Sequence, residues 1–130
     1  VLAPSEGKVV AVVDALPDNP LGTKDARNPA GNHVVIESGE RRYVFLAHLR
    51  KGSVTVKPGE RVSTGQVLGR VGNSGNSDFP HLHLHVQDKP TLNQGNGLNP
   101  VFAGMQVELT GKVFEGVSWP LIRGLFVRGR

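Results

Sequence analysis

The stretch HVVIESGERRYVFLAHL, residues 33–49, contains two apolar segments separated by a polar bridge. The segments run from His33 to Glu37 and from Tyr43 to Leu49, and both are rich in β-branched and aromatic residues. Between them, Ser38-Gly39-Glu40 has the composition of a turn. Two such segments around a short turn are typical of a β-hairpin. The stretch therefore predicts a pair of antiparallel strands.

The rest of the chain favours further short strands. Residues 7–13 predict a buried strand, and residues 67–71 predict a short one after the turn Lys57-Pro58-Gly59-Glu60. The tail at 105–114 is compatible with additional strands. The 17 glycines and nine prolines are spread along the chain, and no window shows a sustained helical period. The fold class expected is mainly β.

A chain of 130 residues is ordinarily one domain. We expect the main β domain to occupy residues 1–100 and a C-terminal extension to occupy 101–130. Residues 17–31 are rich in Pro, Asn, Asp and Gly and predict a long loop, either functional or a tolerated surface insertion. A second loop is expected at residues 72–77, directly before a run of histidines.

Charge and composition narrow the function classes. The net charge of +4 and pI near 9.9 suit anionic partners, such as wall polymers, or serve solubility alone. Nucleic acid is disfavoured because the basic residues are scattered and only five Phe, one Tyr and one Trp are available for stacking. Zero cysteines exclude disulfides and thiolate metal ligands. No apolar stretch approaches the roughly twenty residues of a membrane span. The chain begins at Val1, as a processed or excised segment would.

Three of the five histidines fall in the run PHLHLHV, residues 80–86. On a strand, His81, His83 and His85 would share one face, backed by apolar residues on the other. Imidazole is a common zinc ligand, and residues two apart on a strand lie about 7 Å apart. A fourth imidazole, His48, lies within an otherwise apolar segment, where it needs a partner or a function. The pattern suggests hydrolytic zinc chemistry.

Several motifs together resemble the lysostaphin- and LytM-like zinc endopeptidases, over roughly Val1 to Val86, about two-thirds of the chain. The most specific are Ala-His-Leu, Gly-Gln-Val-Leu-Gly and Pro-His-Leu-His. They occur in the family's order at residues 47–49, 65–69 and 80–83, together with Ala3-Pro4 through Val10, Gly31 through Ile36, Val56-Lys57-Pro58-Gly59 and Val71 through Gly75.

The resemblance implies a small antiparallel β-sandwich or barrel-like fold with a groove between loops, in which two histidines and one aspartate hold Zn²⁺. His83 matches a zinc ligand, and His48 and His81 match the two histidines that flank the metal-activated water. The family's other His and Asp ligands would precede the position of Val1. Asp14, Asp18, Asp25 and Asp78 are weak candidates to replace the aspartate. His85, at a position where the family often has glutamate, is a rim residue or supports His83, and His33 is a surface or groove-edge residue.

The implied function is hydrolysis of peptide bonds in peptidoglycan crossbridges or stem peptides, outside the cell, in the wall or in the periplasm. The partner would be a peptidoglycan peptide, with neither nucleic acid nor membrane insertion. An alternative is a catalytically inactive relative that binds the wall or regulates. A third possibility is a lipoyl, biotinyl or phosphohistidine carrier, which would leave the alternating histidines and the Ala-His-Leu segment unexplained.

Overall fold

The computed structural model describes residues 1–109, 112–120 and 126–128, with side chains described as far as Ala103. Every helix or strand in these ranges is a β-strand, so the prediction of a mainly β chain with antiparallel strands is confirmed. The closure into a sandwich or barrel stays a prediction. The chain divides into two compact units, Val1–Leu98 and Asn99–Arg130.

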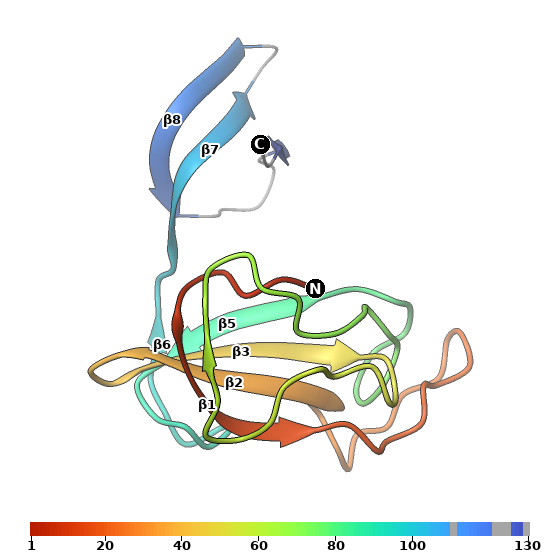
Figure 1. Cartoon of the computed structure of the whole chain (residues 1–130). Coiled ribbons are helices and arrows are strands. Elements are labelled where there is room, and N and C mark those ends of the chain that lie inside the picture. The colour runs from red at the N-terminus through yellow and green to blue at the C-terminus, as the bar shows by residue number, and fades with distance from the viewer. Residues whose placement is uncertain (110–111, 121–125, 129–130) are drawn as a thin grey trace. The chain divides into compact units, whose positions relative to one another are not determined.

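The first unit contains one six-stranded antiparallel sheet, in the order β4-β1-β2-β3-β5-β6. Its central strands lie side by side in Figure 1. The bounds are β1 Gly7–Val13, β2 Asn32–Gly39, β3 Arg42–Leu49, β4 Arg61–Val62, β5 His83–Gln87 and β6 Gly97–Leu98.

The hairpin expected at residues 33–49 forms β2 and β3. One face of the sheet carries Val34, Ile36 and Leu46, each 0% exposed, in the main hydrophobic core. The opposite face carries Val35 beside its cross-strand partner Phe45, and both are also buried. Each fully buried side chain of this kind contributes about 1.5–3 kcal/mol. Burial on both faces explains why this segment is almost continuously apolar.

The register of the sheet changes where β3 reaches His48. Asn32 pairs with Leu49 and Val34 pairs with Leu46, so two residues of β3 oppose one residue of β2. His48 has φ 61°, a left-handed conformation that is uncommon outside glycine. This bulge ends the ladder between β3 and β5, whose last pair is Ala47 with His83. The bulge therefore re-aims the His48 side chain at the edge of the paired region.

Two sequence expectations differ from the structure. Residues 67–71 form no strand: Val67 and Val71 make single bridges to Leu2 and Leu49, and the short strand β4 lies earlier in the sequence. His81 was expected on a strand with His83 and His85, but β5 begins only at His83. The ladder that would have held His81 stops at the bulge in β3, so the chain before His83 follows its own loop contacts.

The second unit contains a three-stranded antiparallel sheet in the order β8-β7-β9. Its strands are β7 Val101–Leu109, β8 Lys112–Pro120 and β9 Phe126–Arg128. A search of the described residues for a helix long and apolar enough to cross a membrane finds none.

Candidate active site

Three imidazoles meet where the bulge in β3 faces the start of β5. The ring centroid of His48 lies 4.8 Å from that of His81 and 5.7 Å from that of His83. They come from the end of β3, from the loop before β5 and from the first residue of β5. The structure thus brings together the three histidines for which the family resemblance implies roles. Those roles stay predictions.

His48 is 5% exposed and is held through Nδ1, which lies 2.9 Å from the carbonyl oxygen of Ser74. A carbonyl oxygen only accepts, so Nδ1 of His48 donates and Nε2 keeps the lone pair in the neutral ring. Burial lowers the pKa of His48, an effect that the Ser74 carbonyl partly opposes and the charge of His81 reinforces. His48 therefore favours its neutral form.

Ser74 is itself held by a buried polar network. Its hydroxyl accepts from the backbone N–H of Asn32 at 2.8 Å and donates to the carbonyl oxygen of Leu49 at 2.8 Å. The Asn32 side chain contacts the carbonyl of Leu49 and both backbone groups of Leu16. Ser74 and Asn32 are each 0% exposed. Because buried polar groups without partners cost about 1–3 kcal/mol each, this network fixes the loop that carries the Ser74 carbonyl.

His81 is held in the same manner from its own loop. Its Nδ1 lies 2.9 Å from the carbonyl oxygen of Phe79 and 3.2 Å from the hydroxyl of Ser77. That hydroxyl also lies 2.8 Å from Oδ1 of Asn73. The carbonyl of Phe79 requires Nδ1 to carry the proton in the neutral ring. His48 and His81 therefore both keep the lone pair on Nε2.

His83 has the opposite arrangement. Its ring contacts the neighbouring imidazole through Nε2, which lies 2.9 Å from Nδ1 of His85. The ring is solvent-exposed in part, yet partial burial lowers its pKa, and the nearby rings of His85 and His48 lower it further. The neutral form, which binds metals, is therefore favoured.

A hollow of about 270 Å³ opens beside His48, His83 and His85. Its walls come from the loop at 17–31, the loop at 72–77, the strands β3 and β5, and the loop after β5. The lining residues are Pro29, Ala30, Ala47, His48, Asn76, His83, His85, Leu92 and Asn93.

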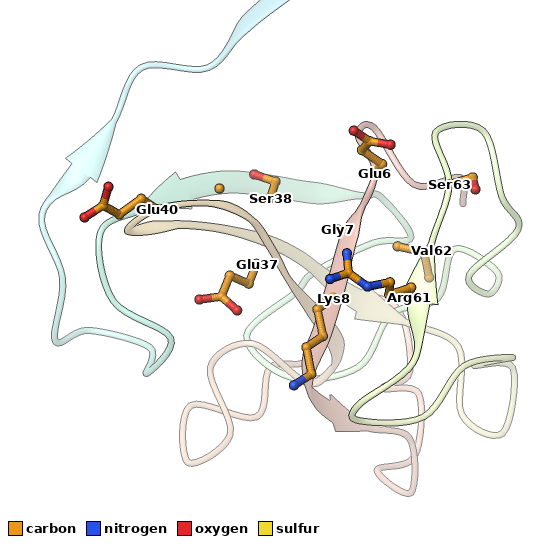
Figure 2. Close-up of a pocket in the computed structure, with 10 residues that line it drawn as sticks. Glu6, Gly7, Lys8, Glu37, Ser38, Glu40, Arg61, Val62 and Ser63 are labelled. Atoms are coloured by element: carbon orange, nitrogen blue, oxygen red, sulfur yellow. The ribbon is translucent and has the colours of Figure 1, made fainter.

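A second hollow, of about 560 Å³, lies elsewhere on the sheet and contains no histidine. Figure 2 shows its lining, which comes from β1, β2, β4 and the residues next to them. It carries carboxylates at Glu6, Glu37 and Glu40 and cations at Lys8 and Arg61. Tyr43 donates to Glu37 at 3.1 Å, which raises the pKa of the phenol. The mixed charges of this hollow point to no particular reaction.

Among the residues that the structure describes, no group of three His, Cys, Asp or Glu side chains is placed to hold a metal ion. The four candidate aspartates have other contacts: Asp14, Asp18 and Asp25 accept backbone N–H groups, and Asp78 pairs with Lys24 at 3.0 Å. The donors that the structure describes therefore do not complete a zinc site, and the ligand role of His83 stays a prediction.

Sequence reasoning missed the residues that orient the histidines. Ser74, Ser77 and Asn32 are polar residues in or beside Gly- and Asn-rich segments, where exposure is the ordinary expectation. Their burial depends on contacts between segments about forty residues apart, such as Asn32 with Ser74. A single sequence gives no signal for such contacts.

The chain is similar in sequence to parts of two longer proteins. It is 44% identical over 63 residues to the peptidoglycan DD-endopeptidase ShyA of Vibrio cholerae, covering 47% of this chain and 14% of that protein. It is 29% identical over 89 residues to endolysin 2638A of Staphylococcus phage 2638A, covering 68% of this chain and 18% of that protein. The chain thus spans less than a fifth of either relative's length.

Solved structures share the fold. The catalytic domain of lysostaphin from Staphylococcus simulans has a TM-score of 0.55 at 23% identity, over 75% of this chain and 65% of that one. A mutant catalytic domain of the prophage-encoded M23 protein EnpA of Enterococcus faecalis has a TM-score of 0.53 at 25% identity, over 74% and 64%. A zinc-containing peptidase from Vibrio cholerae has 0.50 at 28%, over 72% and 24%. The sequence model of peptidase family M23 matches residues 1–100, and the chain therefore belongs to that family.

Proposed function

We propose that this chain carries the peptidase domain of a zinc-dependent peptidoglycan endopeptidase, in which His83 is one zinc ligand and His48 and His81 are the catalytic histidines. The observation that carries the proposal is the opposite orientation of these rings. His48 and His81 are both anchored through Nδ1 to backbone carbonyls, whereas His83 is engaged through Nε2. Two rings thus offer Nε2 to a substrate and the third offers Nδ1 to a metal.

The two catalytic rings suit proton transfer during amide hydrolysis. Nε2 of His48 or His81 can accept a proton from the attacking water and return it to the leaving amine. The other ring, once protonated, can donate a hydrogen bond to the oxyanion. The lowered pKa of His48 keeps that ring available as a base near pH 7. Zinc, when bound, supplies a Lewis acid that acidifies a water and polarises the carbonyl.

Peptidoglycan peptides, either crossbridges or stem peptides, are the proposed substrate. The family match and the likeness to a protein named a peptidoglycan DD-endopeptidase support this substrate class. The site of action would be outside the cell, in the wall or in the periplasm. Residues 1–100 would form the peptidase part and 101–130 an extension. Both the family match over residues 1–100 and the compact unit Val1–Leu98 support that division.

A second candidate is a catalytically inactive relative that binds the wall or regulates another enzyme. The specific observation in its favour is that the described residues contain no trio of metal ligands. This candidate predicts binding to peptidoglycan without zinc and without release of peptide amines.

The experiment measures zinc content and hydrolysis of purified peptidoglycan by the protein, expressed with any residues that its gene encodes ahead of Val1. The proposal expects stoichiometric zinc and new amine ends in the wild type. His83→Ala should lose zinc and activity together. His48→Ala and His81→Ala should keep zinc and lose hydrolysis by about 10²–10⁴-fold.

His33→Ala is the matched control, because His33 lies on β2, contacts the carbonyl of Gly31 just before that strand and does not line the histidine hollow. It should retain zinc and most of the activity. Full zinc content in His83→Ala would refute the ligand assignment. Binding to peptidoglycan by a zinc-free, inactive wild type would favour the second candidate.

A further inference from the structure

Beyond the three histidines, β5 carries a row of side chains that continues away from the hollow. His83, His85 and Gln87 alternate along one face of β5, opposite Ala47, Phe45 and Tyr43 of β3. Nε2 of His83 lies 2.9 Å from Nδ1 of His85, and Nε2 of His85 lies 3.2 Å from Oε1 of Gln87. The contacts thus form a continuous chain from the buried end of β5 to the candidate ligand.

Gln87 sets the donor-to-acceptor direction of this series of hydrogen bonds. Its side-chain amide nitrogen lies 2.7 Å from the carbonyl oxygen of Lys89 and 2.7 Å from that of Thr91. Carbonyl oxygens only accept, so the two N–H groups must face them, and the amide cannot be flipped without losing both bonds. Gln87 is 5% exposed, where such losses are costly. Oε1 is thereby committed as an acceptor towards His85.

The proton positions follow in sequence. Because Oε1 of Gln87 accepts, Nε2 of His85 must carry a proton, and in the neutral ring Nδ1 is then an acceptor. Nε2 of His83 must therefore donate to Nδ1 of His85. The neutral His83 ring is left with its lone pair on Nδ1.

The orientation of His85 is fixed independently by packing. Its ring stacks on Phe45 with centroids 4.6 Å apart and an interplanar angle of 10°, and Phe45 is 1% exposed. A ring clamped flat on a buried aromatic cannot rotate about its axis at low cost. Its two nitrogens are therefore presented at fixed positions to His83 on one side and Gln87 on the other.

We propose that Gln87 and His85 form a positioning chain that selects the Nε2–H tautomer of His83 and so presents Nδ1 as its metal-binding nitrogen. Histidine ligands generally donate their other N–H to a carboxylate, carbonyl or water, which fixes the tautomer and the ring orientation. Here an imidazole takes that role, itself oriented by a buried amide. The relevance to zinc rests on the proposed function, whereas the tautomer does not.

The first experiment is ¹⁵N NMR of the metal-free protein at about pH 8.5, well above the ordinary imidazole pKa of about 6.5. The proposal expects protons on Nε2 of both His83 and His85, with a scalar coupling across the hydrogen bond from His83 Nε2 to His85 Nδ1. A proton on Nδ1 of His85 in the wild type would overturn the proposal. This readout needs neither zinc nor activity.

Two substitutions of His85 test its hydrogen-bond acceptor and its aromatic ring separately. His85→Phe keeps a flat ring to stack on Phe45 and removes the acceptor, whereas His85→Glu restores an acceptor and removes the ring. His83 should become a mixture of tautomers in His85→Phe and stay in the Nε2–H form in His85→Glu. Zinc affinity should fall about 10–100-fold in the first variant and recover to within a few-fold of wild type in the second.

Gln87→Leu provides a second route, because it removes the acceptor for Nε2–H of His85 and should also mix the tautomers of His83. If His83 stays entirely in the Nε2–H tautomer in both His85→Phe and Gln87→Leu, the proposal is overturned. If the wild type shows the expected tautomers and coupling but binds no zinc, the positioning chain stands and the proposed function fails.

Discussion

The carbonyl oxygen of Ser74 accepts a hydrogen bond from Nδ1 of His48 across 2.9 Å, and this contact joins the loop at 72–77 to the end of β3. His48 occupies a left-handed backbone conformation there, with φ 61°. Strain of this kind costs about 1–3 kcal/mol and persists only where surrounding contacts determine it. The Ser74 network provides those contacts, so the orientation of His48 depends on a loop far away in the sequence.

Ser74→Ala should destabilise the protein by about 1–3 kcal/mol, because it leaves the buried N–H of Asn32 without its acceptor and removes one of the two side-chain donors to the carbonyl of Leu49. Urea denaturation measures the change. Ser63→Ala is the matched control at an exposed serine and should alter the free energy of unfolding by less than about 0.5 kcal/mol. Equal effects of the two variants would contradict the role assigned to the buried hydroxyl.

Gly75→Ala should be much more damaging than Gly22→Ala, although both glycines have φ 78°. The left-handed conformation costs a non-glycine residue about 1–2 kcal/mol at either position. A Cβ at Gly22 meets nothing within 4 Å, whereas at Gly75 it would overlap the backbone nitrogen of Gly31. The difference between the two variants in urea denaturation therefore reports the close approach of the two loops. Similar losses in both would show that only φ matters.

His48 and His81 should both hold their proton on Nδ1 when neutral, since each ring donates through that nitrogen to a backbone carbonyl. Nitrogen-15 shifts of the metal-free protein at about pH 8.5 distinguish the two tautomers of each ring. The same spectrum should show His83 in the opposite form. A proton on Nε2 of His48 would contradict its proposed role as a base.

The hairpin and the candidate histidines could be predicted from the sequence because their signals are local. Two apolar segments rich in β-branched and aromatic residues around a short turn are sufficient to predict β2 and β3. The position of His81 could not be predicted, because the alternation of Pro80 to Val86 continues through the point where the ladder stops. That stop comes from the bulge at His48, on another strand. The pattern of one segment carries no information about its partner's register.

The orienting groups were also beyond sequence reasoning, for a related reason. Gln87 continues the row of His83 and His85, yet a glutamine at the end of a strand is ordinarily exposed. Its burial arises because the loop after β5 folds back and offers the carbonyls of Lys89 and Thr91. Only the folded chain shows that this amide has one permitted orientation.

The buried imidazole of His48 should make stability depend on pH. Burial lowers its folded-state pKa below the unfolded value of about 6.5, so the unfolded chain binds more protons in the interval between the two. The contribution of His48 is therefore fully present above about pH 6.5 and is lost as the pH falls through the folded-state pKa. His48→Asn removes the titrating ring while tolerating the left-handed backbone. In urea denaturation of the metal-free protein, the free energy of unfolding of the wild type minus that of His48→Asn should decrease as the pH is lowered from about 8 to about 5.

Gly22→Ala is the control for this pH dependence, because it alters no titrating group. The free energy of unfolding of the wild type minus that of Gly22→Ala should not change with pH. A difference against His48→Asn that is constant, or that grows on acidification, would show that burial does not disfavour the charged imidazole.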